Sequence, residues 1–221
     1  MYLSRLILNP RSRQVRSELA DIYEMHRTVM KAFAGHLADA ERVLFRLDVH
    51  PRTGVPTLLV QSQELPDWSF LLEAGKDYLL SADDLPLDVE NPAVKPVEVM
   101  LKPGQVLAFR LRANPTVKKD REGQKQGRRV GLVREDDQLA WLQRKVEAAG
   151  GSLVSANVSN DGRVGGKLFR DEEKHRLSFV AVQFDGVLQV KDPDLLVKSL
   201  GAGFGSGKGL GFGLLSLAPM R

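Results

Sequence analysis

The chain has 221 residues, of which 43% are hydrophobic and 27% charged, a composition typical of a globular protein with one large domain or two smaller ones. It contains no cysteine, which excludes disulfide bonds and thiolate metal sites. The four histidines are scattered without the spacing of a metal site, so we expect no metal ion. No apolar run is long enough to span a membrane, and the first residues lack the pattern of a signal peptide, so we expect a cytoplasmic protein.

The first half of the chain predicts, in order, a strand, two helices, two strands, a weak helix and a linker or long loop. These lie at residues 2–8, 12–19, 22–37, 43–49, 56–63, 68–79 and 81–96. Asp21 precedes the second helix and Glu24 follows three residues later, which is a capping-box pattern. The two strands after this helix are joined by a turn and predict a hairpin.

The second half repeats this order as a strand, a helix, two strands, a helix and a last strand. These lie at residues 105–113, 136–149, 153–158, 177–184, 193–200 and 214–218. Asp185-Gly186 predicts a two-residue hairpin turn into a further strand at residues 187–190. Asp192-Pro193 gives the cap and first position of the last helix.

This repeated βαββαβ order predicts an α+β protein of tandem ferredoxin-like domains, with antiparallel sheets and helices on one face. We expect the first domain at residues 1–96 and the second at residues 97–221. Sheets of this class commonly present a face to single-stranded or hairpin RNA.

Charge is unevenly distributed along these elements, although the net charge is only +4. Acids outnumber bases by nine to two between Glu64 and Glu98, whereas bases outnumber acids by seven to two between Lys118 and Arg134. Such segregation is expected of a nucleic-acid-binding protein, although any single charged run can equally be a solvated surface. The basic candidates for RNA contacts are Lys118, Arg128, Arg129, Arg163, Lys167 and Arg170.

Glycine occupies every second position from Gly201 to Gly213. Backbone N–H groups freed of side-chain cover can form a concavity for phosphate. The hydrophobic residues among the glycines argue against a flexible tail, but the glycines could also serve only to let the last strand pack. Neither a Walker A loop nor a Gly-x-Gly-x-x-Gly fingerprint fits, which disfavours a nucleotide cofactor and favours a longer anionic polymer. The candidate RNA-binding residues of this run are Gly205, Gly207, Lys208, Gly209 and Gly211.

The second predicted helix carries Tyr23, His26, Arg27 and Lys31, spaced so that all four can share one broad face. A lone helical histidine is more often structural or simply exposed, but histidine is suited to proton transfer near neutral pH. Arg27 or Lys31 could stabilise charge on a phosphorane-like transition state, while Tyr23 could orient a hydroxyl.

Two groups of acidic residues and two phenylalanines are further candidates for a functional role. We interpret Asp83-Asp84 as part of the linker and residues 135–137 as the acidic start of a helix, because no third ligand is spaced to complete a metal site. Phe204 and Phe212 could stack on bases, but anchoring the glycine run in the core is at least as plausible.

Four motifs resemble the CasE family of bacterial CRISPR systems, and the resemblance runs from residue 3 to residue 219. The motifs lie at residues 6–10, 23–28, 109–115 and 207–219. The resemblance implies two ferredoxin-like domains, metal-independent cleavage beside the stem-loop of CRISPR repeat RNA, and a product retained within the Cascade complex. It also implies that Tyr23 and His26 are the catalytic pair and that the basic stretch around residues 163–170 enters the groove of the RNA stem.

Taken together, these features predict a metal-independent endoribonuclease in which the substrate's own 2′-hydroxyl attacks the adjacent phosphate. His26 would act as general base or acid, Tyr23 would position, and Arg27 and Lys31 would stabilise the developing charge. The expected partners are the repeat RNA and other Cascade subunits, with no membrane and no cofactor. The alternative is a scaffold subunit that binds RNA without cutting it, with His26 incidental.

Overall fold

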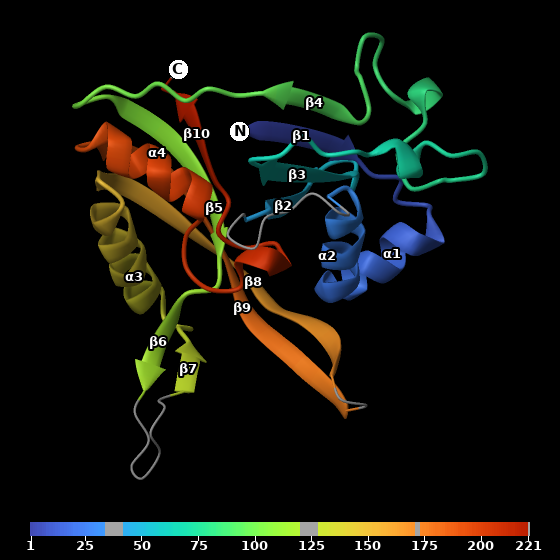
Figure 1. The fold of residues 1–221 in the computed structure, drawn as a ribbon. Coiled ribbons are helices and arrows are strands. Elements are labelled where there is room, and N and C mark those ends of the chain that lie inside the picture. Colours follow the sequence, from blue (N-terminus) through green and yellow to red (C-terminus); the bar gives the residue numbers. More distant parts are fainter. Residues whose placement is uncertain (34–41, 120–127, 171–172, 221) are drawn as a thin grey trace. The chain divides into compact units, whose positions relative to one another are not determined.

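The computed structural model describes residues 1–33, 42–119, 128–170 and 173–220. Contacts between residues divide the chain into two compact units, each with its own sheet and helices (Figure 1). Unit 1 comprises Met1–Glu98, Gly165–Leu177 and Gly209–Gly211, and unit 2 comprises Val99–Val164, Ser178–Lys208 and Phe212–Arg221. Each unit consists of three separate stretches of the chain, whereas the two predicted domains, residues 1–96 and 97–221, are each continuous. The predicted domain boundary therefore stays a prediction.

Unit 1 is built on a four-stranded antiparallel sheet in the order β2-β3-β1-β4. Its strands are β1 (Tyr2–Ile7), β2 (Leu44–Val49), β3 (Pro56–Ser62) and β4 (Ala93–Pro96). Leu6 of β1 and Leu58 of β3 are register partners, and both are buried in the core. The order of the strands is that of a ferredoxin-like sheet.

Two helices, α1 (Arg13–Ala20) and α2 (Ile22–Lys31), lie on the same side of this sheet (Figure 1). Asp21 separates them, and its carboxylate accepts a hydrogen bond from the Tyr23 backbone N–H at 3.1 Å, which confirms the Asp21 half of the predicted capping box, whereas the Glu24 carboxylate accepts from Arg27. Ile22, Met25 and Val29 are buried along one stripe of α2. The predicted continuation of this helix to residue 37 falls partly on residues 34–41, outside the described residues.

The stretch between β3 and β4 differs from the sequence prediction. It has two short 3-10 helices, Ser69–Leu71 and Ala82–Asp84, in place of the weak helix at residues 68–79. Gly75, at φ +82°, takes a conformation that an α-helix cannot contain. The predicted linker also contains β4, whose four residues pair with β1. The strand was not predicted, because the stretch is acidic and contains prolines.

Unit 2 has a second four-stranded sheet, in the equivalent order β10-β5-β9-β8. Its strands are β5 (Val106–Ala113), β8 (Gly151–Arg170), β9 (Glu173–Val190) and β10 (Leu215–Pro219). Helices α3 (Glu135–Ala148) and α4 (Pro193–Ala202) share one core with this sheet. The core contains the side chains of Leu107, Phe109, Leu111, Trp141, Leu142, Phe184, Leu196 and Leu200. The predicted class, α+β with tandem ferredoxin-like folds, is confirmed.

The hairpin turn predicted at Asp185-Gly186 is wrong, because both residues lie inside the continuous strand β9. Gly186 is the register partner of Phe109 in β5. A Cβ atom at Gly186 would collide with the backbone oxygen of Ser155 and lie 2.9 Å from the Phe109 ring. The glycine therefore permits a close approach of backbone within the sheet. An Asp-Gly sequence can mark such a packing site as well as a turn, so the dipeptide alone does not distinguish the two.

Two further strands, β6 (Thr116–Lys119) and β7 (Arg128–Gly131), form a separate antiparallel hairpin in unit 2. Its connection, residues 120–127, lies outside the described residues. After α4 the glycine run passes through a 3-10 turn at Lys208–Leu210 and enters β10, so the predicted last strand is confirmed. Within the described ranges, no helix has the length and apolar character needed to cross a membrane.

Candidate functional site

Tyr23 and His26 lie one turn apart on α2, beside the capped start of the helix. Their ring centroids are 6.0 Å apart and the ring planes are inclined by 37°. Both side chains are half-buried, which leaves part of each ring accessible. The structure therefore brings this predicted pair together, at a distance at which both could contact one substrate group.

The environment of His26 favours the neutral imidazole. Burial lowers the pKa of His26 below its ordinary value of 6.5, and a hydrogen bond with the backbone of Gly209 has a smaller effect in the opposite direction. The ring is thus mainly unprotonated near pH 7, the state in which a histidine can accept a proton. No metal ion or acidic side chain is needed to produce this state.

Gly209–Gly211, three residues of the glycine run, belong to unit 1 together with α2. A Cβ atom at Gly209 would lie 3.6 Å from Cε1 of His26, so this backbone lies directly against the imidazole. A Cβ atom at Gly211 would lie 3.1 Å from the Phe45 ring and 3.2 Å from Cδ1 of Ile22, and Gly211 has φ +77°. The run thus contacts the candidate catalytic histidine, a contact between residues far apart in the sequence that no local pattern predicts.

Gly166 is a further residue of this site that sequence analysis missed. It is buried in β8, in the part of that strand assigned to unit 1. A Cβ atom at Gly166 would lie 3.1 Å from the Asp21 carboxylate and 3.3 Å from Cβ of Tyr23. The glycine therefore lets β8 approach the first turn of α2, and the Gly165-Gly166 pair in the sequence was the only signal for it.

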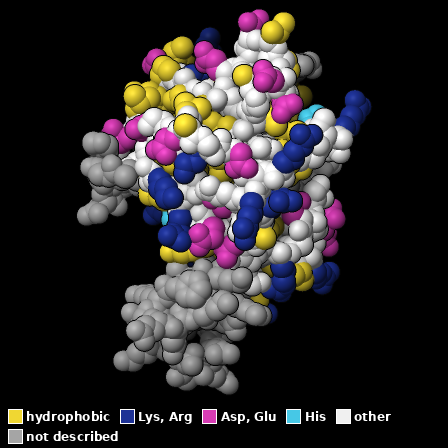
Figure 2. All heavy atoms as spheres, turned by 90° about the vertical axis from the view of Figure 1, so that its right-hand side faces the viewer, with side chains coloured by type: hydrophobic (Ala, Val, Ile, Leu, Met, Phe, Trp, Pro, Cys, Tyr) yellow, Lys and Arg dark blue, Asp and Glu magenta, His cyan; other side chains and the backbone are white. Residues whose placement is uncertain are grey.

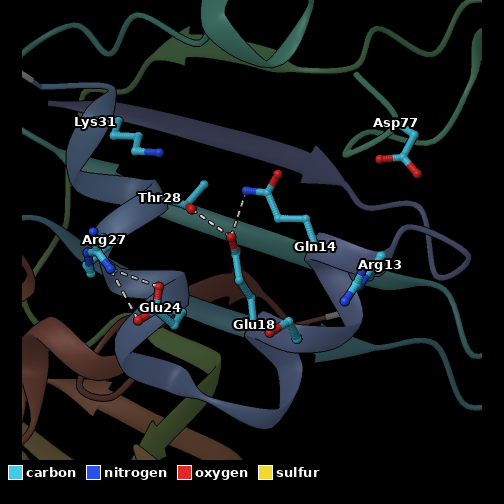
Figure 3. Close-up of a pocket in the computed structure, with 9 residues that line it drawn as sticks. Arg13, Gln14, Glu18, Glu24, Arg27, Thr28, Lys31 and Asp77 are labelled. Carbon is cyan, nitrogen blue, oxygen red and sulfur yellow. Dashed lines mark hydrogen bonds and ion pairs between the residues drawn. The ribbon is translucent and has the colours of Figure 1, made fainter. Parts of the chain in front are cut away.

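Arg27 and Lys31 lie on another side of α2 and line a hollow between α1 and α2, which we call the α1–α2 hollow (Figure 3). It has a volume of about 560 Å³. Its lining comprises Arg13, Gln14, Ser17, Glu18, Glu24, Arg27, Thr28, Lys31 and Asp77. Neither Tyr23 nor His26 lines this hollow, so the four residues grouped on the predicted helix are divided between two surfaces.

The charged groups of the α1–α2 hollow are partly paired. Arg27 donates to the Glu24 carboxylate at 3.1 Å, in an exposed ion pair on α2. Asp77 accepts a hydrogen bond from the Ser12 hydroxyl at 2.8 Å. Figure 2 views the molecule from the right-hand side of Figure 1, where α1 lies, and shows Lys and Arg side chains with Asp and Glu between them. The described side chains of this face are therefore of mixed charge.

Glu18 ties α1 to the elements around the α1–α2 hollow. Its carboxylate accepts hydrogen bonds from Thr28 of α2 at 2.7 Å, from Tyr78 at 2.6 Å and from Gln14 at 2.9 Å. Glu18 is 4% exposed and Tyr78 is 1% exposed. Burial, and secondarily the neighbouring Glu18, raise the pKa of Tyr78, so its hydroxyl stays protonated and donates. This network fixes α2, and sequence analysis missed it because a glutamate in an amphipathic helix ordinarily marks the solvent face.

The remaining glycine-run candidates lie in unit 2. A Cβ atom at Gly205 would lie 2.8 Å from the Trp141 ring, and one at Gly207 would lie 3.0 Å from the Phe212 ring. Phe212 is 1% exposed, and Phe204 is likewise buried, so both rings are core residues. The Lys208 amine donates to the backbone oxygen of Ala202 at 2.7 Å. These contacts show a structural use for the glycines, and RNA contact by Gly205, Gly207 and Lys208 stays a prediction.

The basic candidates are distributed over the β6–β7 hairpin and strand β8, in which Arg163 belongs to unit 2 and Lys167 and Arg170 belong to the part assigned to unit 1. Lys118 and Arg129 are cross-strand partners in the hairpin, and Arg128 is paired with Lys119. Arg163 of β8 donates to the Ser178 hydroxyl at 3.3 Å. The side chains of Lys167 and Arg170 lie outside the described residues.

Comparison with known proteins assigns the chain to a family. A model of the CRISPR associated protein family matches residues 1–219. The chain belongs to this family. CRISPR-associated endoribonuclease Cse3 of Thermus thermophilus is 38% identical over 236 residues, covering 99% of this chain and 100% of Cse3. CRISPR system Cascade subunit CasE of Escherichia coli K12 is 30% identical over 234 residues, covering 100% of both chains.

The structural comparison agrees with this assignment. A structure of Cse3 bound to a 19-nucleotide RNA matches with a TM-score of 0.82 at 38% identity, covering 99% of this chain and 100% of that chain. The resemblance of the four sequence motifs to the CasE family is therefore confirmed. So is the tandem ferredoxin-like class that the motifs implied.

For this member of the CRISPR associated protein family, the acidic residues considered as metal ligands have structural positions. Glu135, Asp136 and Asp137 form the acidic first turn of α3, as expected from the helix dipole. Asp83 and Asp84 lie in a short 3-10 helix. In the part of the chain that the structure describes, no group of three or more His, Asp and Glu side chains could hold a metal ion.

Proposed function

We propose that the protein is an endoribonuclease that cuts CRISPR precursor RNA beside the repeat stem-loop. Its membership of the family supports this proposal, as does its 38% identity to a protein named as an endoribonuclease. The observation that carries it is the Tyr23–His26 pair with Gly209 against the imidazole, because this arrangement places a neutral, partly accessible histidine beside a phenol.

The chemistry is an internal transfer at one phosphodiester. His26 accepts the proton of the 2′-hydroxyl, the 2′-oxygen forms a bond to the adjacent phosphorus, and the bond from phosphorus to the 5′-oxygen breaks. The leaving 5′-oxygen takes up a proton from solvent and His26 afterwards releases its proton to solvent, so the products are a 2′,3′-cyclic phosphate and a 5′-hydroxyl. Because the nucleophile belongs to the substrate, no bound hydroxide is required and we propose that no metal ion takes part.

Tyr23 has a positioning role in this scheme. In this scheme His26 transfers the proton, so the Tyr23 hydroxyl serves only to orient the substrate. The Tyr23 ring lies beside the imidazole, with ring centroids 6.0 Å apart. The proposed charge-stabilising role of Arg27 and Lys31 stays a prediction. Both line the α1–α2 hollow, where they are suited to hold phosphate oxygens of the same RNA strand.

After cleavage the RNA stays bound and the protein serves as a subunit of a larger ribonucleoprotein. The E. coli relative is named a Cascade subunit, which supports this part of the proposal. We place the activity in the cytoplasm, where CRISPR transcripts are made. A scaffold subunit without activity is the alternative function, and it requires that the Tyr23–His26 arrangement has no chemical use.

Cleavage of repeat RNA in EDTA tests the mechanism. We expect cutting to persist in EDTA and to stop when the 2′-hydroxyl at the cut linkage is replaced by hydrogen, while binding stays nearly unchanged. An RNA with the same replacement one nucleotide away is the control and should be cut normally. Efficient cutting of the first RNA, or a strict need for magnesium, contradicts the mechanism.

A further inference from the structure

Unit 2 contains a hollow of about 220 Å³ that the proposed catalytic chemistry does not use. It lies between the end of β5, the β6–β7 hairpin, β8, the start of β9 and the glycine run. Six of its lining residues carry polar side chains: Asn114, Thr116, Arg129, Arg163, Ser178 and Ser206. We call it the Asn114–Ser206 hollow.

The charge of this hollow is of one sign. Arg129 and Arg163 both line it, and none of the described residues that line it is acidic. Among the described residues, neither arginine forms an ion pair. Both side chains are exposed, so each guanidinium can reach a ligand without leaving a carboxylate. Two such groups at one concavity attract a planar or tetrahedral anion.

The polar wall of the hollow is fixed by hydrogen bonds before any ligand binds. Asn114, which is 6% exposed, donates from its amide to the Ser206 hydroxyl at 3.2 Å. Ser206 donates to the Asn114 backbone oxygen at 3.1 Å and lies 3.4 Å from the Thr116 hydroxyl. The Asn114 side-chain oxygen accepts from the Val180 N–H at 3.2 Å. Ser206 therefore attaches the glycine run to the end of β5 and presents a hydroxyl in a defined place.

Size and surroundings indicate which ligand fits. The volume is smaller than the roughly 300 Å³ at which small-molecule sites begin, so the hollow suits one phosphate group and not a complete ligand. Lys118 is the cross-strand partner of Arg129 and shares its face of the hairpin. The positive charge thus continues out of the hollow along the hairpin, as needed for a ligand that is part of a chain.

We propose that the Asn114–Ser206 hollow binds one backbone phosphate of the RNA, with Arg129 and Arg163 holding the same phosphate. The hydroxyls of Ser178 and Thr116 complete the set of groups that face its oxygens. This inference rests on the proposed function, because it takes RNA as the ligand. It adds that one phosphate at a fixed position along the strand is bound by two arginines from separate elements, which fixes how far the RNA is inserted.

A series of RNAs, each with one neutral methylphosphonate linkage, tests this proposal on the full-length protein. The RNAs carry the 2′-deoxy replacement at the cut site so that binding is measured alone. For the wild-type protein we expect one linkage at which the neutral group weakens binding roughly tenfold, the scale of a lost charge-assisted hydrogen bond. In Arg129→Gln and in Arg163→Gln, each of which keeps one of the two arginines, the neutral group at this same linkage should weaken binding by only about threefold, and in the double variant by less than about twofold.

Arg144→Gln is the matched control, since Arg144 is an exposed arginine of α3 outside the hollow. It removes the same charge and should leave the tenfold effect in place. Melting temperatures of all three variants should match the wild type, because each replaces an exposed side chain. A second readout is salt dependence: the double variant should reduce the slope of log Kd against log salt by about one, not two, because one phosphate is neutralised.

The proposal is overturned if the two arginine variants suppress the effects of two different linkages, or of none, while the wild type binds and cuts repeat RNA. Those results would place the arginines on separate phosphates or off the RNA, and they would leave the proposed function standing. If the wild-type protein neither binds nor cuts repeat RNA, the proposed function fails, and this inference fails with it.

Discussion

Among single residues, the proposed cleavage depends most on the protonation of His26. Burial lowers its pKa below 6.5, so the neutral ring persists to lower pH than in a free histidine. If the neutral ring is the base, kcat/KM rises with pH through a midpoint below 6.5 and is level near pH 7. Single-turnover cleavage measured from pH 4.5 to pH 8.5 checks this expectation, because this range covers about two units on either side of the ordinary value.

A midpoint above 6.5, or a rate that falls as pH rises through 7, would contradict the role of His26 as the base. His50 provides a control variant away from α2. It is exposed in unit 1, and its ring accepts a hydrogen bond from the Thr53 backbone N–H at 3.2 Å. Replacing His50 by Gln should leave the pH profile of cleavage unchanged.

Sequence reasoning succeeded for residues whose relation is local. The spacing of Tyr23 and His26 predicted that the two rings lie together on α2, and they do. The same reasoning placed Arg27 and Lys31 on one face of the helix with Tyr23 and His26. That face is so broad that Arg27 and Lys31 line the α1–α2 hollow, which Tyr23 and His26 do not line. Glu18 could not be recognised, because its partner Tyr78 is 60 residues away in the sequence and approaches only in the folded unit.

At the scale of elements, the glycine run has a structural role that can be separated from RNA binding. Gly211 has φ +77° and lies against Phe45 and Ile22, whereas at Gly209 a Cβ would make ordinary contact with His26. We therefore expect Gly211→Ala to destabilise the protein by more than about 1 kcal/mol and Gly209→Ala to have little effect. Thermal or urea unfolding of the two variants in parallel provides the measurement.

RNA affinity of the folded variants, measured on the same preparations, then decides between the two interpretations of the glycine run. A folded Gly211→Ala protein that binds RNA normally identifies the run as a packing device. Weakened binding with an unchanged melting temperature supports a phosphate cradle. Equal stability losses in Gly209→Ala and Gly211→Ala would contradict the geometry of this segment.

The elements that sequence analysis missed have a common physical cause. β4 was hidden in an acidic, proline-containing stretch because its pairing with β1 is set by the sheet and not by its own composition. The predicted turn at Asp185-Gly186 failed because a glycine that permits close packing inside β9 has the same local signal as a turn glycine. Strongly patterned elements such as β5 and α3 were predicted to within two residues.

At the scale of the whole molecule, the order of elements was sufficient to predict two ferredoxin-like folds. Both sheets have equivalent strand orders, β2-β3-β1-β4 and β10-β5-β9-β8. The sequence could not predict that Gly165–Leu177 and Gly209–Gly211 are assigned to the first unit. These two segments belong to unit 1 because of contacts between residues that are distant in the sequence. Gly166 and Gly209 in these segments lie against Tyr23 and His26 of α2.

Replacement of the two ring residues of α2 tests most directly whether the Tyr23–His26 pair performs the proposed cleavage. Single-turnover cutting of repeat RNA by His26→Ala should be slower than wild type by about 10²-fold or more, the usual scale of a lost general acid–base. Tyr23→Phe should cost less, because the ring remains and only the hydroxyl is lost, and RNA affinity should be nearly unchanged in both. If both variants cut at the wild-type rate, α2 is not the active site and the protein is better described as an RNA-binding scaffold.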